Sequence, residues 1–321
     1  MWSLAAKIAW GTLPSRPSAT TAPSASNGRT PAWTPPRRPK PGYRGGIGGP
    51  ALHLPLNETT LLFVTSTNPA PADGMIARVS MILDVFTPEE PVLTGGEIAR
   101  RAGLSRATTA RILSQLAKHD FVNRVPSGYQ IGIRCFELGQ MAQQPKDLRR
   151  LALGTMFDLR RATGLTVQLG VLEGNDVVYI EILRGQYRDL TIPSRVGGRV
   201  PSYATAGGKA LLAHSPDHLV EGLLNGELEK IGPGTMTDPQ ELRAELDLAR
   251  REGIAYEREE SHAGLACAAS PILRGDGTAV AAISITAPVG VVEMRLVGPA
   301  VHAATLGLNR QLAAAPHWAT L

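Results

Sequence analysis

Four polar side chains, spaced as one face of a short helix, have the chemistry needed to bind DNA. Thr108, Arg111, Gln115 and Lys118 follow one another at three- and four-residue steps, so they share one side of a helix. An arginine can form paired hydrogen bonds with guanine and a glutamine with adenine, and a lysine ammonium suits phosphate. Because most polar helical faces are only solvated surface, the surrounding elements must support this interpretation.

Residues 93–105 supply a helix and a turn in front of that face. Thr94 and Glu97 have the spacing of a capping box, which predicts a helix that runs to Arg101. Gly103 then provides a turn, and Ser105 can cap the second helix. The buried side of the second helix is expected to consist of Ala110, Leu113, Leu116 and Ala117.

A helix before this pair and a hairpin after it complete the unit. An apolar helix is predicted over 76–86, and the runs 122–125 and 129–131 predict two strands around a turn in which Gly128 takes a positive φ. Three helices and a hairpin in this order are typical of a winged helix-turn-helix, so double-stranded DNA is the expected partner. The side chains expected to contact DNA are Thr94, Ser105, Arg106, Thr108, Thr109, Arg111, Gln115, Lys118, Arg124 and Tyr129.

The basic charge of the chain is concentrated in its first 74 residues. The formal net charge is +5, but residues 1–74 hold 7 Lys and Arg against 2 Asp and Glu, whereas the remainder holds 26 of each sign. The net charge is therefore not the footprint of a DNA-binding surface. Residues 1–74 also hold 12 of the 25 prolines, which predicts a disordered tail. Met75 stands directly before the first predicted helix, which leaves open that translation starts there.

The cysteines and histidines give no sign of a metal site. Cys135 and Cys267 are far apart, and neither has a metal-ligand spacing with the seven histidines. We therefore expect no metal and no cofactor. The apolar patch 4–10 is interrupted by Lys7 and is too short to cross a bilayer, so we expect a cytoplasmic protein without a membrane partner.

The remainder of the chain changes from helical to strand periodicity. A linker helix is predicted over 134–144 and ends at Pro145, and another helix is predicted from about Asp147 to Gly164. Period-two and β-branched runs then predict strands over 166–172, 177–182, 189–194, 255–258, 265–269 and 280–285. Helices are expected over 208–213, 216–225, 239–252 and 291–312. This mixture indicates an α+β domain with an antiparallel sheet.

Several motifs stand in a recognisable order in this second part. They are Arg199-Val200-Pro201, Ala204–Ala213 with its Gly-Gly-Lys, Thr237-Asp238, Glu259-Glu260, Gly264–Ala269 and Ala282–Ile285. The series resembles the effector-binding domain of the IclR family of bacterial transcription regulators, and residues 105–116 are similar to that family's DNA-binding helix. The resemblance spans about residues 75–315.

The resemblance implies an α+β architecture and an assembled protein. The implied architecture consists of an N-terminal winged helix-turn-helix, a linker helix and a C-terminal GAF-like effector-binding domain with an antiparallel sheet. The implied assembly is a homodimer or homotetramer. The expected limits are 1–74 for the tail, 75–132 for the DNA-binding domain, 133–150 for the linker helix and hinge, and 151–315 for the effector-binding domain.

The turn before Lys209 is the best candidate for an anion site. It leads into a helix, whose first backbone amides, at Ala206 and Gly207, lack an acceptor and can hold a carboxylate. A phosphate-binding P-loop does not fit, because Tyr203 replaces its first glycine and Ala210 its hydroxyl residue. The resemblance implies a small organic acid as effector, bound by Ile192, Val200, Ala206, Gly207, Glu257, Leu265, Cys267, Ser284 and Thr286. Two of these, Ser284 and Thr286, are two apart on a strand, so their hydroxyls share a face.

The leading hypothesis is a ligand-responsive transcription regulator that controls a catabolic or metabolic operon. A small acid would shift the relative placement of two winged helices in a dimer. One alternative is an enzyme with a DNA-binding appendage and Cys267 as nucleophile, although its apolar strand predicts a buried, unreactive thiol. Another is an architectural DNA-binding protein, which would leave the large second domain without a purpose.

Overall fold

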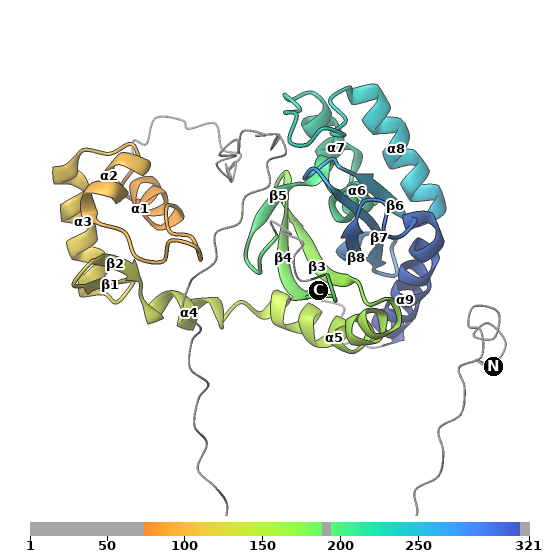
Figure 1. The fold of residues 1–321 in the computed structure, drawn as a ribbon, viewed down its shortest axis with the longest axis horizontal. Coiled ribbons are helices and arrows are strands. Elements are labelled where there is room, and N and C mark those ends of the chain that lie inside the picture. The colour runs from red at the N-terminus through yellow and green to blue at the C-terminus, as the bar shows by residue number, and fades with distance from the viewer. Residues whose placement is uncertain (1–73, 188–193, 315–321) are drawn as a thin grey trace, which may run out of the picture. The chain divides into compact units, whose positions relative to one another are not determined.

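The computed structural model describes residues 74–187 and 194–314 (Figure 1). The expected tail, except Gly74, and most of the strand expected at 189–194 lie outside the described residues. The observed class is α+β, as expected: three helices and a hairpin come first, and a domain built on an antiparallel sheet follows. No described helix is long and apolar enough to cross a membrane.

The second and third helices begin where the capping residues predict, and the first begins one residue before the predicted start and ends at Asp84, two residues before the predicted end. α1 spans Met75–Asp84, α2 spans Gly95–Arg101 and α3 spans Arg106–Lys118. The Thr94 hydroxyl accepts a hydrogen bond from the Glu97 amide, and the Ser105 hydroxyl accepts one from the Thr108 amide. The second hydrogen bond of a capping box would run from the Thr94 amide to the Glu97 carboxylate. Here the Glu97 carboxylate instead accepts hydrogen bonds from Arg100 and Arg101.

The buried side of α3 differs from the expected one. Thr109, Ile112, Leu113 and Leu116 are buried, whereas Ala110 is exposed. These buried positions follow the steps i, i+3, i+4 and i+7, which turn the inner stripe away from Ala110. The large side chain of Ile112 therefore packs with Ile82 of α1 in the core of the winged-helix domain, residues 75–131.

The wing is a two-stranded hairpin that also pairs with the segment before α2. β1 (Val122–Val125) and β2 (Gly128–Ile131) are antiparallel, and Leu93 and Tyr129 exchange two backbone hydrogen bonds. Gly128 has φ +147°, and a Cβ atom there would lie 2.2 Å from the Leu93 carbonyl oxygen. The close approach of these two backbones thus requires glycine.

The segment after the wing contains two helices with bounds unlike the expected ones. α4 spans Ile133–Gly139, and α5 spans Gln143–Thr163 and ends at Gly164 in the left-handed conformation. Pro145 does not end a helix. It is the third residue of α5, in the first turn, where a missing N–H breaks no helical hydrogen bond.

The sheet has the strand order β5-β4-β3-β8-β7-β6, and all neighbours are antiparallel. Its strands are β3 (Thr166–Glu173), β4 (Asp176–Leu183), β5 (Arg199–Pro201), β6 (Ala255–Arg258), β7 (Leu265–Leu273) and β8 (Ala279–Pro288). The short edge strand β5 was not predicted as a strand. The central pair, β3 and β8, joins segments more than a hundred residues apart in the chain.

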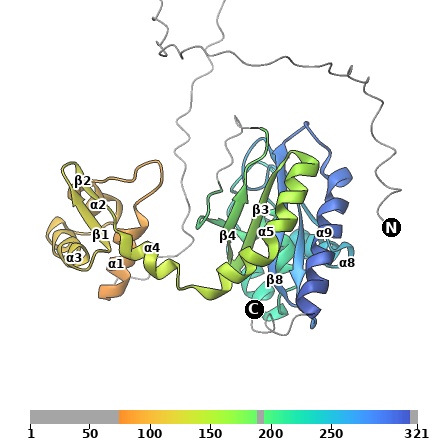
Figure 2. The ribbon, with the colours of Figure 1, turned by 90° about the horizontal axis from the view of Figure 1, so that it is seen from below.

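Helices cover both faces of this sheet. α5 and α9 (Met294–Ala314) pack against one face through Leu148, Met156 and Val301 (Figure 2). α6 (Ala206–Leu212) packs against the other face, next to Tyr179 and Cys267. α7 (Asp217–Leu224) and α8 (Pro239–Glu252) form a further cluster with the single turn η1 (Ser202–Ala204).

Successive side chains along each strand point alternately to these two helical layers. On β7, Leu265, Cys267 and Ala269 face the α6 side, whereas Ala266 and Ala268 face the α9 side. Polar groups gather on the α6 side of the central strands, which makes this layer the place to look for a ligand.

Candidate functional site

The outer face of α3 carries the expected basic and amide side chains. Arg106, Arg111, Gln115 and Lys118 are exposed on this helix, and Arg124 is exposed on the wing. Within the described residues, none of the three helical cations forms a salt bridge. This face therefore presents unneutralised positive charge and one amide to the solvent.

Other members of the expected DNA-contact set have structural roles. Thr94 and Ser105 cap helices, and the half-buried Thr108 hydroxyl accepts a hydrogen bond from the Ser105 hydroxyl. Tyr129 packs partly into the core. Thr109 is fully buried and its hydroxyl has no partner among the described residues, so its side chain does not lie on the α3 surface and the prediction that it faces DNA is wrong in this conformation.

A buried polar network lies at the centre of the sheet, on the α6 side. The Gln168 Oε1 atom on β3 accepts hydrogen bonds from Ser284 at 3.0 Å and Thr286 at 2.9 Å on β8. Its Nε2 atom donates to the Ser194 hydroxyl at 2.5 Å. The two β8 hydroxyls thus share one face, as their spacing predicts, and a single amide holds both.

A carboxylate and a thiol face the same space from the outer strands. The Glu257 Oε1 atom on β6 accepts hydrogen bonds from the Ser261 amide at 3.1 Å and hydroxyl at 2.5 Å. The Cys267 sulfur lies 3.2 Å from the Thr286 hydroxyl. Burial, together with the nearby Glu257 charge, raises the pKa of the Cys267 thiol well above its ordinary value. Burial also raises the pKa of Tyr179 on β4.

These groups surround a small cavity of about 20 Å³, which is room for one water molecule. It is lined by Gln168, Tyr179, Ser194, Val200, Glu257, Ser261, Leu265, Cys267 and Thr286. We call it the inner pocket. Five residues of the expected effector set line it, and Ser284 contacts it through Gln168.

The remaining members of the expected effector set lie elsewhere. Ile192 is outside the described residues, and Ala206 and Gly207 are buried in α6 but do not line the inner pocket. The adjacent Gly208 has a packing role, because a Cβ atom there would lie 2.1 Å from the Ser202 carbonyl oxygen. The Gly208 amide donates a hydrogen bond to the Thr205 hydroxyl at 2.9 Å, so this glycine lets the helix start pack closely against η1.

A buried ion pair stands behind the inner pocket. The Lys209 ammonium on α6 is fully buried and lies 2.7 Å from the Glu260 Oε1 atom and 3.6 Å from the Glu245 Oε1 atom on α8. Burial raises the pKa of Glu260 to about 7, against the opposing effect of Lys209. The lysine of the Gly-Gly-Lys motif is therefore a structural cation and does not reach a phosphate.

Sequence reasoning missed Gln168, Tyr179, Ser194 and Ser261 of the inner pocket. The sequence did contain a signal for Gln168, because it is a lone amide inside an apolar strand. Residues two apart on a strand share a face, and the residues two positions from Gln168 face the α6 layer. Ser194 and Ser261 lie in loops without a periodic pattern, so only the folded chain brings them to the site.

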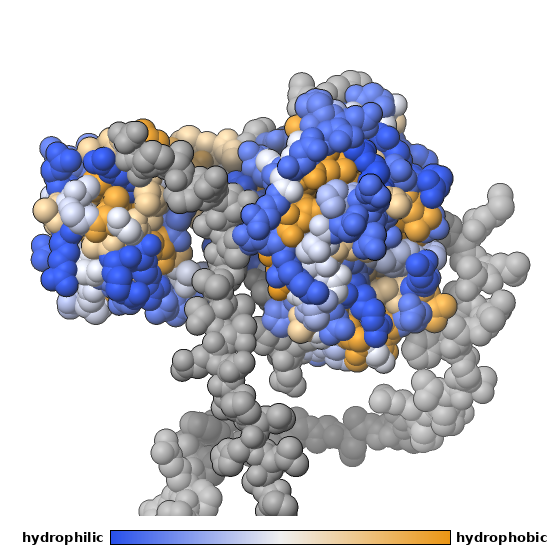
Figure 3. Space-filling view, turned by 90° about the horizontal axis from the view of Figure 1, so that it is seen from above, coloured by the Kyte–Doolittle hydropathy of each residue, from blue (hydrophilic) through white to orange (hydrophobic). Residues whose placement is uncertain are grey.

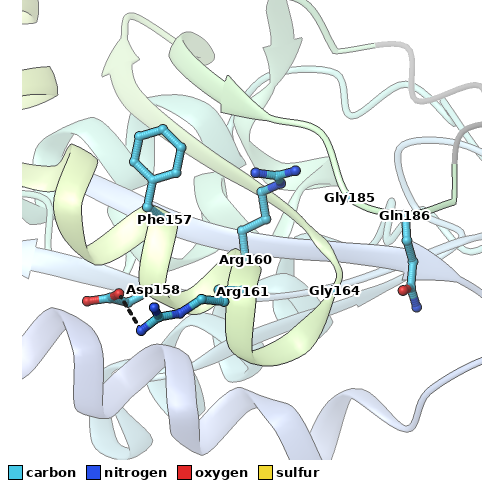
Figure 4. A pocket seen from close by; sticks show the side chains of 7 residues that line it. All are labelled: Phe157, Asp158, Arg160, Arg161, Gly164, Gly185 and Gln186. Atoms are coloured by element: carbon cyan, nitrogen blue, oxygen red, sulfur yellow. Dashed lines mark hydrogen bonds and ion pairs between the residues drawn. The ribbon is translucent and has the colours of Figure 1, made fainter. Parts of the chain in front are cut away.

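Another cavity, of about 660 Å³, lies away from this chemistry. Figure 4 shows Phe157, Arg160 and Arg161 on α5 on one side of it and Gln186 on the other. Its polar side chains are exposed, and Arg161 is paired with Asp158. No cluster of His, Cys, Asp and Glu in the described part of the chain is arranged to hold a metal ion.

Two family models match this chain in the order of its domains. The IclR helix-turn-helix domain matches residues 75–126, and the bacterial transcriptional regulator IclR C-terminal domain matches residues 140–305. The chain belongs to the IclR family of transcriptional regulators.

Known relatives support this assignment over most of their length. The HTH-type transcriptional regulator XynR of Escherichia coli is 31% identical over 243 residues, which cover 74% of this chain and 96% of the relative. KdgR of the same organism is 34% identical over 227 residues, 68% of this chain and 86% of the relative. A crystal structure of an IclR homologue from Microbacterium hydrocarbonoxydans, complexed with 4-hydroxybenzoate, is 31% identical with a TM-score of 0.68 and covers 75% of this chain and all of that chain.

The chain is thus a DNA-binding transcriptional regulator with an effector domain, and this family is non-enzymatic. The alternative of a Cys267 nucleophile is wrong. The thiol is buried, and its raised pKa keeps it protonated at neutral pH.

Proposed function

We propose that the inner pocket senses a small organic acid that also carries a hydroxyl group. The observation that carries this proposal is the division of the pocket wall. Donor groups, namely the second N–H of the Gln168 amide and the Ser194 hydroxyl, lie on one part, and the acceptor Glu257 lies on another. A carboxylate needs donors, and a ligand hydroxyl can donate to Glu257, so both polar ends of such a molecule would be satisfied.

The bound ligand of the Microbacterium homologue has this chemistry, since 4-hydroxybenzoate carries a carboxylate and a phenol. The apolar wall from Tyr179, Val200 and Leu265 suits a short aliphatic or aromatic body between the two polar ends. A buried Glu257 without a ligand hydroxyl would repel an acid, which gives the pocket selectivity for hydroxylated acids over plain ones.

The size of the inner pocket makes binding a conformational event. A cavity of about 20 Å³ cannot hold an organic acid, so its lining must move to admit one. A ligand that binds only the opened form shifts the population toward that form. We propose that this shift changes the relative placement of two DNA-binding domains and thereby the transcription of a catabolic or metabolic operon.

A thermal-stability screen tests the acid proposal. The full chain is mixed separately with 4-hydroxybenzoate, benzoate and phenol, of which the last two each lack one polar group. We expect 4-hydroxybenzoate or a small aliphatic hydroxy acid, such as lactate, to raise the melting temperature, and the single-group probes to have little effect.

Two variants locate the binding. Thr286→Val removes one of the two hydroxyls that hold the Gln168 Oε1 atom, at nearly constant shape, and we expect the less well held amide to weaken acid binding about tenfold. Ser114→Ala, on the exposed side of α3, is the matched control and should not change it. If no hydroxy acid stabilises the wild-type protein, or if Thr286→Val binds as well as wild type, the acid-sensing role is refuted.

We also propose the DNA-contact surface, the assembly and the domain limits. The proposed DNA-contact surface consists of Arg106, Thr108, Arg111, Gln115, Lys118 and Arg124. Thr94, Ser105 and Tyr129 belong to it at its margin, where they also cap helices or pack into the core. The assembly is a homodimer or homotetramer in the cytoplasm. The domain limits are 75–132 for DNA binding, 133–150 for the linker and 151–315 for effector binding, with 1–74 as a tail, although α5 runs without a break through residue 150.

A further inference from the structure

A second cavity lies at the outer edge of the sheet, beside the edge strand β6. It has a volume of about 230 Å³ and is lined by Glu245, Tyr256, Glu257, Arg258, Glu260, Ala266, Val292, Glu293, Met294 and Arg295. These residues come from α8, from β6 and the loop after it, from β7, and from the last residues before α9 and its first turn. We call it the edge cavity.

One part of the edge cavity has more carboxyl groups than cations. Glu257 and Glu260 are buried, the Glu245 side chain is 24% exposed, and Lys209 is the one described cation buried among these three carboxyl groups. The Glu260 side chain is only 6% exposed, and its Oε1 atom accepts a hydrogen bond from the Lys209 ammonium. Its Oε2 atom is buried and has no hydrogen-bond partner within the described residues, although the residue lines the cavity. A buried carboxyl oxygen left without a donor is costly, and a ligand donor would remove that cost.

The other part of the edge cavity carries two arginines and one carboxylate, that of the exposed Glu293, which accepts a hydrogen bond from the Arg295 amide at 3.4 Å. Arg258 and Arg295 are both exposed, and neither forms a salt bridge in the described part of the chain. The Arg295 guanidinium lies 5.0 Å from the centre of the Tyr256 ring, which fixes its position at the cavity wall. Neighbouring residues of a strand point to opposite faces, so Glu257 faces one way and Tyr256 and Arg258 face the other.

We propose that the edge cavity binds a small zwitterion, an α-amino acid, whose ammonium group meets Glu260 and whose carboxylate meets Arg258 and Arg295. An ammonium has three donors, which suit the unpartnered Glu260 oxygen and a neighbouring carboxylate. A carboxylate suits paired hydrogen bonds from a guanidinium. A metal ion fits less well, because Lys209 already lies among the acidic groups and no metal-binding cluster is present among the described residues.

Amino-acid binding is tested with the full chain and each of the proteinogenic L-amino acids singly, by thermal shift. Ethylammonium and propionate serve as probes that keep one charged group each. We expect at least one amino acid to raise the melting temperature, and neither single-charge probe to match it. The best amino acid is then titrated by calorimetry.

Variants at both ends of the cavity assign the binding to it. Glu260→Gln and Arg258→Gln are each expected to weaken the amino acid about tenfold, since each removes one charged hydrogen-bond partner. Asp247→Asn and Arg251→Gln, at exposed positions of α8 outside the cavity, are the matched controls and should bind as wild type. If Glu260→Gln does not fold, the exposed Arg258 carries the test at the other end.

Three results would overturn this inference. They are a failure of all the amino acids to stabilise the protein, equal binding of ethylammonium and the best amino acid, and unchanged affinity in the Arg258→Gln variant. None of them depends on the inner pocket, whose acid binding is measured separately with Thr286→Val.

Discussion

At the residue scale, the α3 face depends on few side chains, because the folded part of the chain has no net charge. We expect Arg111→Ala to weaken operator binding by roughly 1–3 kcal/mol if its guanidinium contacts a base, and to relax sequence preference at one position. A mobility-shift assay at fixed salt measures this. Arg251→Ala, on exposed α8, is the control, and equal affinity of the Arg111 variant and wild type would remove Arg111 from the interface.

Glu260 makes the stability of the protein depend on pH. Its pKa is about 7 in the folded protein against an ordinary 4.5, so between these values the folded state binds more protons than the unfolded state. The stabilisation from Glu260 is therefore complete below about pH 4.5 and is lost as the pH rises through about 7. We expect Glu260→Gln to gain stability relative to wild type between pH 5 and pH 8, measured by urea unfolding. A constant difference across this range would contradict the raised pKa.

Residue pairs show what spacing alone can and cannot predict. Ser284 and Thr286 were placed on one face because two residues separate them on a strand, and the structure confirms it. Their common partner Gln168 is more than a hundred residues away, and Lys209 meets Glu260 51 residues along the chain. Such partners follow from strand order, which a single sequence does not reveal.

At the element scale, capping residues predicted helix starts well, because a cap is a local hydrogen bond. Thr94 and Ser105 cap helices as expected, and Asp238 caps α8 in the same way. Pro145 misled the prediction because a proline both ends helices and fits their first turn. The inner face of α3 was misplaced because small alanines carry little information about burial, and the larger Ile112 decides the packing.

The wing supplies an element-scale prediction. Gly128→Ala would place a methyl group against the Leu93 carbonyl, so we expect the strand pairing at Leu93 and Tyr129 to break and their amides to exchange hydrogen much faster. Gly154→Ala is the contrasting control. Gly154 is exposed within α5 with open space around it, so alanine should stabilise that helix by about 1 kcal/mol. Unchanged exchange in Gly128→Ala would disprove the requirement for glycine.

At the scale of the whole molecule, hydrophobic side chains reach the surface of both domains (Figure 3). On and just after α4, Ile133, Phe136 and Met141 are 60%, 63% and 69% exposed. We expect another protein to cover these large apolar side chains, which stand close together in the chain. In the proposed dimer, that protein is a second copy of this chain.

We expect Phe136→Asp to dissociate this dimer, because a charge in an apolar interface is costly to bury. Sedimentation velocity at several concentrations measures the assembly state. Leu296→Asp changes a side chain that is 80% exposed on α9, and it should leave the assembly unchanged. A Phe136→Asp protein that sediments like wild type would exclude α4 from the interface.

The pairing of β3 with β8 also sets the timing of folding during synthesis. Gln168 and Ser284 are 116 residues apart, which corresponds to roughly 6–23 s of translation. During that interval the β3–β4 hairpin has no β8 beside it, and its apolar face depends on α5 alone for cover. The inner pocket does not exist until β8 leaves the ribosome, whereas the winged helix is by then long complete. A newly made chain therefore passes through a period in which it can fold its DNA-binding domain but cannot respond to an effector.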